Sequence, residues 1–173
     1  LWDLGSKVSS GEYRILMAWV FLKWVTAMPP RRLEYAETQL LTKREYDASD
    51  KKGNYVVMGK RKWTWNIHLY KTVEKYGAQV LSVPGPLKAA LNKIKPITKS
   101  KSLGGFIFLN NKFRPLSRSQ FSAFVKWVFQ KYAGKTWTMN TIRSIWKPVV
   151  EDPLKLAKAM GHDLTTAMLH YRQ

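Results

Sequence analysis

A continuous apolar run near the start of the chain, ILMAWVFLKWVTAM at residues 15–28, limits most strongly how this sequence can fold. A helix needs about 20 apolar residues to cross the hydrocarbon core of a bilayer. This run is shorter and is interrupted by Lys23, so we expect a helix buried inside a folded domain and no membrane partner. Pro29 and Pro30 follow at once and should end the helix.

Further helices are expected on both sides of a central, more irregular region. Residues 30–41 should form a second helix, because proline is tolerated at the first helical position. Residues 86–95 place Leu87, Leu91 and Ile94 on one helical face. The stretch KPITKSKSLGG should be a basic connector, and FIFL after it a short strand or a buried turn.

The clearest helical pattern begins at Ser117, which forms a capping box with Gln120 and is followed by an apolar stripe that stops at Gly134. The stripe consists of Phe121, Phe124, Val125, Val128, Phe129 and Tyr132. Shorter helices are expected over residues 140–146 and 153–160. A last helix should begin near Asp163, a good N-cap residue.

Residues 54–83 predict strands instead. NYVVMG, KWTWNIHLYKT and QVLSV are separated by glycines, and Trp63, Trp65, Ile67 and Leu69 alternate with the period of a half-buried strand. The fold class is therefore α+β: one mainly helical domain over residues 1–173, with a small antiparallel sheet of three strands.

The charge points to a polyanionic partner. Thirty Lys and Arg residues against eleven Asp and Glu give a formal net charge of +19, and the basic residues are spread along the whole chain. The hydrophobic content of 45% indicates that this charge lies on a folded core. A nucleic-acid enzyme, a ribosomal-type RNA-binding protein, a membrane-surface protein and a merely basic surface all remain compatible with this composition.

Several kinds of chemistry lack their residues. The sequence has no cysteine, no Walker-type loop, no HExxH and no Gly-x-Ser-x-Gly, and no pair among His68, His162 and His170 has metal-ligand spacing. Acidic residues are too scarce to suggest a two-metal nuclease. We therefore expect no metal and no cofactor, and arginine is the remaining means of holding a phosphate.

Five short motifs occur in a fixed order. They are Arg31 three residues before Glu34, Lys71 in a Tyr-Lys-Thr run before a turn between strands, Asn140 three residues before Arg143, His162 after Gly161, and Tyr171 nine residues after His162. This ordered set resembles the catalytic domain of the tyrosine recombinases, also called phage-type integrases. The resemblance extends over about residues 15–171.

Some positions have competitors when they are taken singly. Arg32 stands beside Arg31, and Lys60 and Lys62 compete with Lys71. The distance to Glu34 favours Arg31, and the Lys-Thr context before a turn favours Lys71.

One position departs from the family pattern. The family usually has His or Lys three residues before its second arginine, and this chain has Asn140. Asparagine can donate a hydrogen bond to a phosphate oxygen but cannot shuttle a proton. His170 is interpreted as a bystander of the site and His68 as a strand residue.

The resemblance implies a reaction on DNA. Tyr171 would attack a scissile phosphate and become joined to the 3′ phosphate, and Lys71 would protonate the departing 5′ oxygen, with neither metal nor ATP.

The same resemblance implies how the phosphate is held. Arg31, Arg143 and His162 would bind its non-bridging oxygens, and Glu34 would orient an arginine.

The resemblance also implies the setting of the reaction. The partner would be double-stranded DNA, bound by a tetramer, although the isolated domain could be a monomer. The N-terminal DNA-clamping domain usual in the family is not in this chain, so we expect the chain to be a fragment. The source would be a virus or mobile element, and the protein would act wherever its target DNA lies, in a host nucleus, a nucleoid or a viral replication site. A type IB topoisomerase and a catalytically weakened DNA-binding relative are the alternatives.

Overall fold

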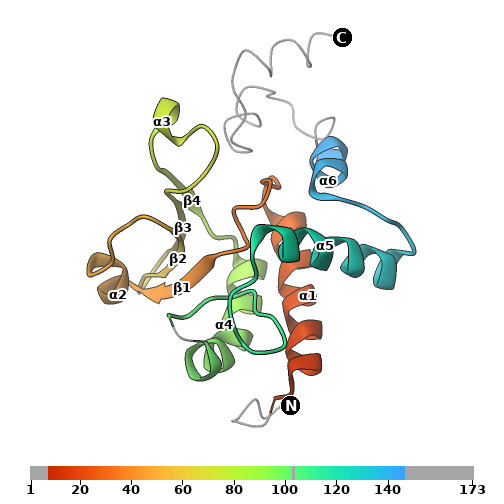
Figure 1. Ribbon diagram of the computed structural model, residues 1–173. Coiled ribbons are helices and arrows are strands. Elements are labelled where there is room, and N and C mark those ends of the chain that lie inside the picture. Colours follow the sequence, from red (N-terminus) through yellow and green to blue (C-terminus); the bar gives the residue numbers. More distant parts are fainter. Residues whose placement is uncertain (1–7, 103, 147–173) are drawn as a thin grey trace.

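A computed structural model describes residues 8–102 and 104–146 of the chain (Figure 1). These residues form six helices and four strands. The elements are α1 (Ser10–Ala27), β1 (Thr38–Thr42), α2 (Lys43–Asp47), β2 (Asn54–Met58), β3 (Trp63–Ile67), α3 (Val73–Tyr76), β4 (Gln79–Ser82), α4 (Gly85–Lys101), α5 (Arg118–Ala133) and α6 (Met139–Trp146). The helices predicted over residues 153–160 and after Asp163 lie outside the described residues.

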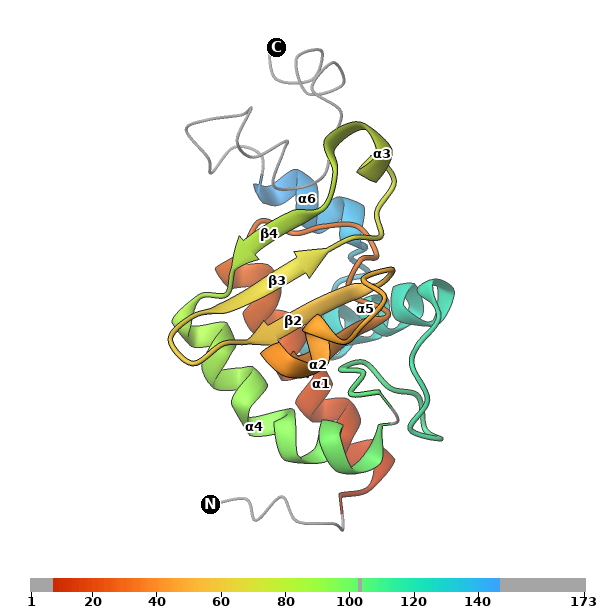
Figure 2. The ribbon, with the colours of Figure 1, turned by 90° about the vertical axis from the view of Figure 1, so that its left-hand side faces the viewer.

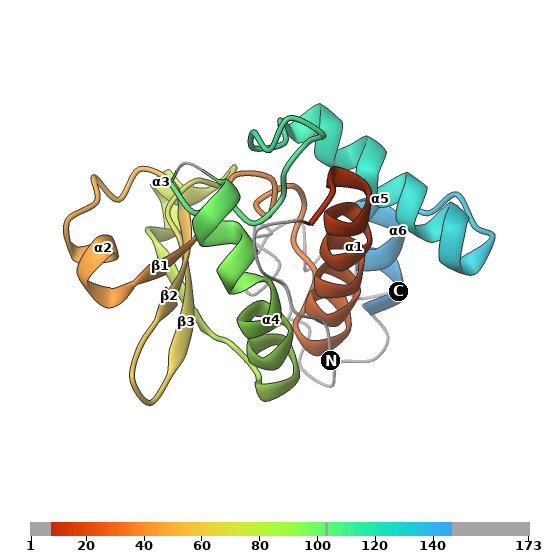
Figure 3. The same ribbon diagram turned by 90° about the horizontal axis from the view of Figure 1, so that it is seen from below.

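The apolar run forms the buried helix that the sequence predicts. A capping box of Ser9 and Glu12 starts α1. The helix ends at Met28, whose extended backbone is the conformation favoured before a proline. Phe21 and Trp24 are fully buried, because α1 is covered by the sheet and α4 on one side and by α5 on the other (Figure 3).

The sheet has four strands in the order β1-β2-β3-β4, which corrects the prediction of three antiparallel strands. β1 pairs with β2 in parallel. The other two pairs are antiparallel, as the arrows of β2, β3 and β4 show in Figure 2. Strands β2, β3 and β4 lie where the alternation predicts them, but β3 ends at Ile67, and Leu69 beyond it is 41% exposed.

The additional strand lies in a segment that the sequence analysis interprets as a helix. Residues 32–37 form turns instead, with the Thr38 N–H donating to the Tyr35 carbonyl (3.0 Å). Thr38–Thr42 then pairs with β2 along its whole length, and the side chain of Leu40 is fully buried in the main core. The long-range pairing overrides a local helical pattern, as β-strand formation often does.

The two faces of the sheet have different roles. Leu40, Val56 and Trp65 belong to the main core between the sheet and the long helices. On the opposite face, Leu41 and Tyr55 belong to a small second cluster against α2. Figure 3 shows the sheet between these two layers.

Helix α4 is longer than the sequence predicts. It runs through Pro96 to Lys101, where we expected a connector. Ile97 and Thr98 are buried and continue the apolar face, and the Thr98 hydroxyl lies 3.2 Å from the Tyr13 hydroxyl on α1. Packing against α1 therefore extends the helix past the proline.

The FIFL stretch is a buried turn with isolated bridges rather than a strand, and its Phe108 is fully buried. Helix α5 has the predicted capping box at Ser117 and ends at Gly134 in the left-handed conformation (φ 62°). Tyr132 is 49% exposed and so is not part of the buried stripe. The predicted helix over residues 140–146 is confirmed as α6.

Candidate active site

The turn that follows α1 carries Arg31 and lies between two segments that are distant in sequence. Figures 1 and 2 show this orange segment at the end of α1, with the α3 link between β3 and β4 on one side and α6 on the other. The predicted site residues within the described ranges come from these three segments.

Arg31 is fully buried, whereas Arg32 is exposed. Its Nη1 donates to the Gln79 Oε1 (2.6 Å), and its guanidinium lies 5.0 Å from the centre of the Tyr70 ring. Burial lowers the pKa of Arg31, while the charge of Glu34 opposes this shift. Of the two neighbouring arginines, the one that the spacing favours is therefore the one held inside the protein.

Arg143 lies on α6 and is 4% exposed. The Trp146 indole N–H donates to the Val25 carbonyl of α1 (2.8 Å), which fixes α6 against the core. Burial, together with the charges of Arg32 and Arg31, lowers the pKa of Arg143 to about 10. The two predicted arginines therefore lie within electrostatic range of each other.

The guanidinium of Arg143 has unused hydrogen-bond donors. Its Nε and Nη2 are buried and have no hydrogen-bond partner among the described residues. These two nitrogens form the edge that binds two oxygens of one anion. A buried donor pair of this kind is suited to an anionic ligand.

Glu34 lies in the turn after Arg31 and is 8% exposed. Its charge raises the pKa of both Arg31 and Arg143 against the effect of burial. Its Oε2 has no hydrogen-bond partner in the described part of the chain. The carboxylate is therefore close enough to influence both arginines, as an orienting residue would need to be.

Lys71 is exposed and lies in the link between β3 and β4, as its context predicts. The neighbouring Tyr70 contacts Arg31. Lys60 and Lys62 lie in the β2–β3 turn, at the end of the strands opposite to Arg31. The four residue steps of β3, from Trp63 to Ile67, separate the two ends by about 13 Å. The structure thus brings the Lys71 segment, and not the other two lysines, beside Arg31.

Asn140 is exposed on α6, three residues before the buried Arg143. Residues at this spacing are neighbours on a helix surface. His162 and Tyr171 lie outside the described residues, and their roles stay predictions. His68 follows β3 directly instead of lying in it.

Three residues of the site region were missed by the sequence analysis: Asn54, Tyr70 and Gln79. Asn54 and Gln79 lie at strand ends, and Tyr70 lies in the link that follows β3. Asn54 hydrogen-bonds to the Glu34 carbonyl, Gln79 to the Arg31 side chain, and the ring of Tyr70 contacts the same guanidinium. An asparagine that opens an otherwise apolar strand, NYVVM, is the one signal that could have indicated Asn54.

No cluster of three or more His, Cys, Asp or Glu side chains that could hold a metal occurs in residues 8–102 and 104–146. None of the helices in these ranges is long and apolar enough to span a bilayer.

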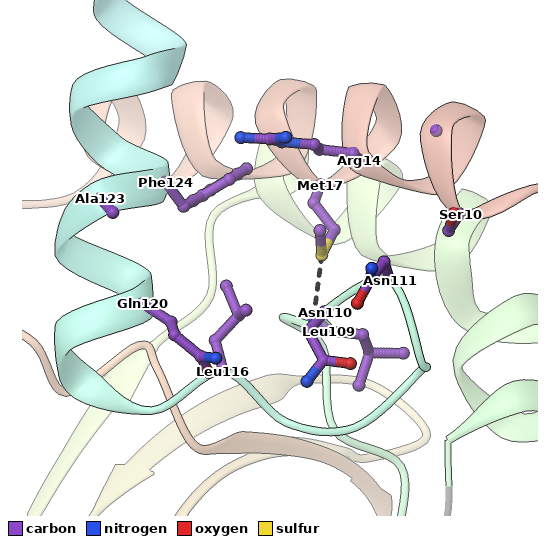
Figure 4. A pocket seen from close by; sticks show the side chains of 11 residues that line it. Ser10, Arg14, Met17, Leu109, Asn110, Asn111, Leu116, Gln120, Ala123 and Phe124 are labelled. Carbon is purple, nitrogen blue, oxygen red and sulfur yellow. Dashed lines mark hydrogen bonds between the residues drawn. The ribbon is translucent and has the colours of Figure 1, made fainter.

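A separate hollow of about 390 Å³ lies between the first half of α1, the start of α5 and the turn around Asn110 (Figure 4). Its charged side chain, Arg14, stacks on Trp127 with 4.0 Å between the guanidinium carbon and the ring centre. The backbone N–H of Leu109 is directed at the Met17 sulfur (3.0 Å). The hollow holds none of the predicted site residues.

No protein-family model matches the sequence, and no curated protein matches it significantly. Solved structures do match. The XerA recombinase matches with a TM-score of 0.60 and 12% identity, over 100% of this chain and 62% of the recombinase. The Tn1549 transposon integrase in complex with transposon right end DNA matches with a TM-score of 0.57 and 14% identity, over 99% of this chain and 63% of the integrase.

This chain therefore spans less than two thirds of the length of either protein. At such low identity the likeness concerns the fold, and the fold is that of a tyrosine recombinase catalytic domain.

Proposed function

We propose that this chain is the catalytic domain of a site-specific DNA recombinase or integrase, which cuts and rejoins DNA through a 3′-phosphotyrosine without metal or ATP. The observation that carries the proposal is the pair of buried arginines, Arg31 and Arg143, brought together from two distant segments. The fold shared with the XerA recombinase and the Tn1549 integrase supports the same reaction class.

The charge of the site suits a phosphodiester. Arg143 keeps a pKa of about 10 in spite of its burial and is therefore cationic at neutral pH. Its Nε and Nη2 have no described acceptor, and two phosphate oxygens would satisfy both donors. A preorganised donor of this kind, when removed, typically lowers a rate by about 10²- to 10³-fold.

The proposed reaction needs a nucleophile and an acid. The Tyr171 oxygen would form a bond to phosphorus and lose its proton to a base, while the bond from phosphorus to the 5′ oxygen breaks. Lys71 would give a proton to that oxygen. An ordinary tyrosine has a pKa of about 10, so the positive charge of the arginines would also favour the attacking phenolate.

Double-stranded DNA is the proposed partner, bound by a tetramer during recombination. The net charge of +19 should make binding strongly dependent on salt. The Lys and Arg residues outside the site would contact backbone phosphates and set the register of the protein on the duplex.

A covalent capture experiment tests the proposal without knowledge of the target sequence. A library of nicked duplexes is incubated with the protein in EDTA, adducts that survive SDS are isolated, and their DNA is sequenced. We expect an adduct from the wild type and none from Tyr171→Phe, with equal salt-sensitive binding by both. An adduct from Tyr171→Phe, or one that forms only with a divalent metal, would overturn the assignment.

The exposed Asn140 favours one second candidate, a DNA-binding relative with weakened catalysis, because asparagine cannot transfer a proton. Salt-sensitive binding without any wild-type adduct would support it. A topoisomerase would form the adduct and relax supercoils, yet it would not exchange strands between two duplexes.

A further inference from the structure

We propose that the side-chain amides of Asn54 and Gln79 are positioning residues that hold the Lys71 segment against the Arg31 turn. The inference rests on the proposed function, because it assigns Lys71 and Arg31 to the same phosphate. We call the two side chains the amide clamp. Asn54 opens β2 and Gln79 opens β4, so both lie at the strand ends from which the link with Lys71 emerges.

Asn54 fixes the start of this link. The side chain is 4% exposed. Its Nδ2 donates to the carbonyl of Glu34 (3.0 Å) and to that of Leu69 (3.1 Å). Its Oδ1 accepts from the backbone N–H groups of His68 (3.0 Å) and Leu69 (2.9 Å). These four bonds use the two N–H donors and both lone pairs of the amide, so one side chain joins the Arg31 turn to the backbone just before Lys71.

Gln79 fixes the end of the link. Its Oε1 accepts from Arg31 Nη1 (2.6 Å), and its Nε2 donates to the Tyr70 hydroxyl (3.2 Å). That hydroxyl donates to the carbonyl of Gly77 (2.7 Å). The bonds form a chain from the buried arginine across the link, and the Tyr70 ring packs against the same guanidinium.

The clamp compensates for the exposure of Lys71 itself. Leu69, Lys71 and Gly77 are exposed, whereas Tyr70, Val73 and Tyr76 of the same link pack against the core. The amides anchor the link at both ends to the turn that carries Arg31. A displacement of about 1 Å at a reacting group can lower a rate by 10²-fold, so these bonds should matter for proton transfer.

The choice of amides also has an electrostatic reason. A carboxylate at position 79 would bond to Arg31 equally well, but it would neutralise the charge that is needed for the phosphate. Glutamine orients the guanidinium and leaves its charge intact. Its Nε2 remains available to donate to the Tyr70 hydroxyl, whereas a carboxylate has no hydrogen to donate.

The test compares two leaving groups. A substrate with sulfur in place of the 5′ bridging oxygen releases a thiolate, which needs no proton because a thiol has a pKa of about 8.5. Asn54→Asp loses the donors to Glu34 and Leu69. It should form adduct about 10²-fold more slowly than wild type on the oxygen substrate, and at close to the wild-type rate on the sulfur substrate, as Lys71→Ala should.

The matched control is Asn66→Asp. Asn66 is a buried amide on the neighbouring strand β3, and its Nδ2 donates to the Thr64 hydroxyl (2.9 Å), away from the link. This variant should behave like wild type on both substrates. Tyr70→Phe is a second test variant, because it removes one oxygen and retains the ring against Arg31; it should show the same preference for sulfur as Asn54→Asp.

The outcomes separate the two hypotheses. Suppose that the wild type forms adduct, but that Asn54→Asp and Tyr70→Phe lower the rate of adduct formation equally on both substrates, or on neither. The clamp is then refuted and the proposed function stands. If the wild type forms no adduct on either substrate, the proposed function fails and the clamp fails with it. Thermal unfolding of each variant identifies any that do not fold, and a folded Tyr70→Phe protein then decides the result.

Discussion

Replacing Arg143 by methionine should stabilise the free protein while it removes the ability to hold a phosphate. Arg143 is 4% exposed, and burial is the main reason that its pKa is lowered from its ordinary value to about 10. One pKa unit corresponds to about 1.4 kcal/mol, so the fold disfavours this charge by roughly 1–3 kcal/mol once solvent screening is included. Methionine has a similar length and no charge, so the replacement removes this penalty; replacing whole buried ion pairs by apolar residues is often neutral or stabilises by about 1–4 kcal/mol.

The expected gain in unfolding free energy is therefore about 1–3 kcal/mol, measured by urea unfolding. Because the folded pKa lies below the unfolded one, the penalty is complete below pH 10 and is relieved only as the pH rises above about 10. The difference between variant and wild type should thus be equal at pH 6 and pH 9. Adduct formation should fall by at least about 10²-fold.

Arg14→Met is the control, since Arg14 is exposed and its charge is not disfavoured by burial; its guanidinium packs on the ring of Trp127. Its unfolding free energy should stay within about 0.5 kcal/mol of wild type, apart from any loss of the ring contact. An Arg143→Met protein less stable than wild type would refute the reasoning, because the guanidinium would then contribute more as a partner than it costs as a buried charge.

Two further predictions concern the fold. Burial raises the pKa of Tyr13 to about 12, and the hydrogen bond to Thr98 opposes this shift. The unfolding free energy should therefore be constant below pH 10 and fall as the pH rises towards 12. Urea unfolding at pH 9 and pH 11.5 should show a smaller loss of unfolding free energy for Tyr13→Phe than for wild type. A Cβ at Gly59 would lie 2.3 Å from the Lys62 carbonyl oxygen, whereas one at Gly85 would meet nothing within 4 Å. Gly59→Ala should therefore lower the unfolding free energy by about 1–3 kcal/mol, and Gly85→Ala should leave it unchanged or slightly higher.

Elements determined by local patterns are the ones that the sequence predicts. The apolar run of α1 and the capping box at Ser117 are local signals, and both helices occur where expected. Strand β1 and the extension of α4 past Pro96 were not predicted. Their cause is contact with distant segments, β2 in the first case and Tyr13 in the second, and no short window of sequence contains such contacts.

The same distinction between local patterns and long-range contacts applies to the site. The order and spacing of Arg31, Lys71 and Arg143 could be recognised in the sequence, and the structure places their segments together. The burial of both arginines and the hydrogen bonds of Asn54 and Gln79 could not be predicted, because an amide has no preferred partner until the fold brings one within about 3 Å. Hydrogen-bond partners are therefore the part of a site that a sequence conceals best.

Tyr35 links the core to the site. It shows how the fold can hold in place two arginines whose charges are disfavoured by burial. Its hydroxyl accepts the backbone N–H of Arg31 (2.8 Å), while its ring stacks on Phe121 (5.7 Å between centres) and meets Trp24 edge-on (5.3 Å). The turn that carries the arginine is thus anchored in the aromatic core.

The charged side chains of the site suit an anionic ligand. Arg31 and Arg143 bring two positive charges and Glu34 one negative charge, and the exposed Arg32 and Lys71 add further positive charge. Positive charge therefore exceeds negative charge among these five side chains. In the proposed reaction, a phosphodiester attacked by a phenolate gains a second negative charge in its transition state, so this excess stabilises the transition state more than the singly charged ground state. An enzyme gains rate from just such a difference, and a second carboxylate beside either arginine would reduce it.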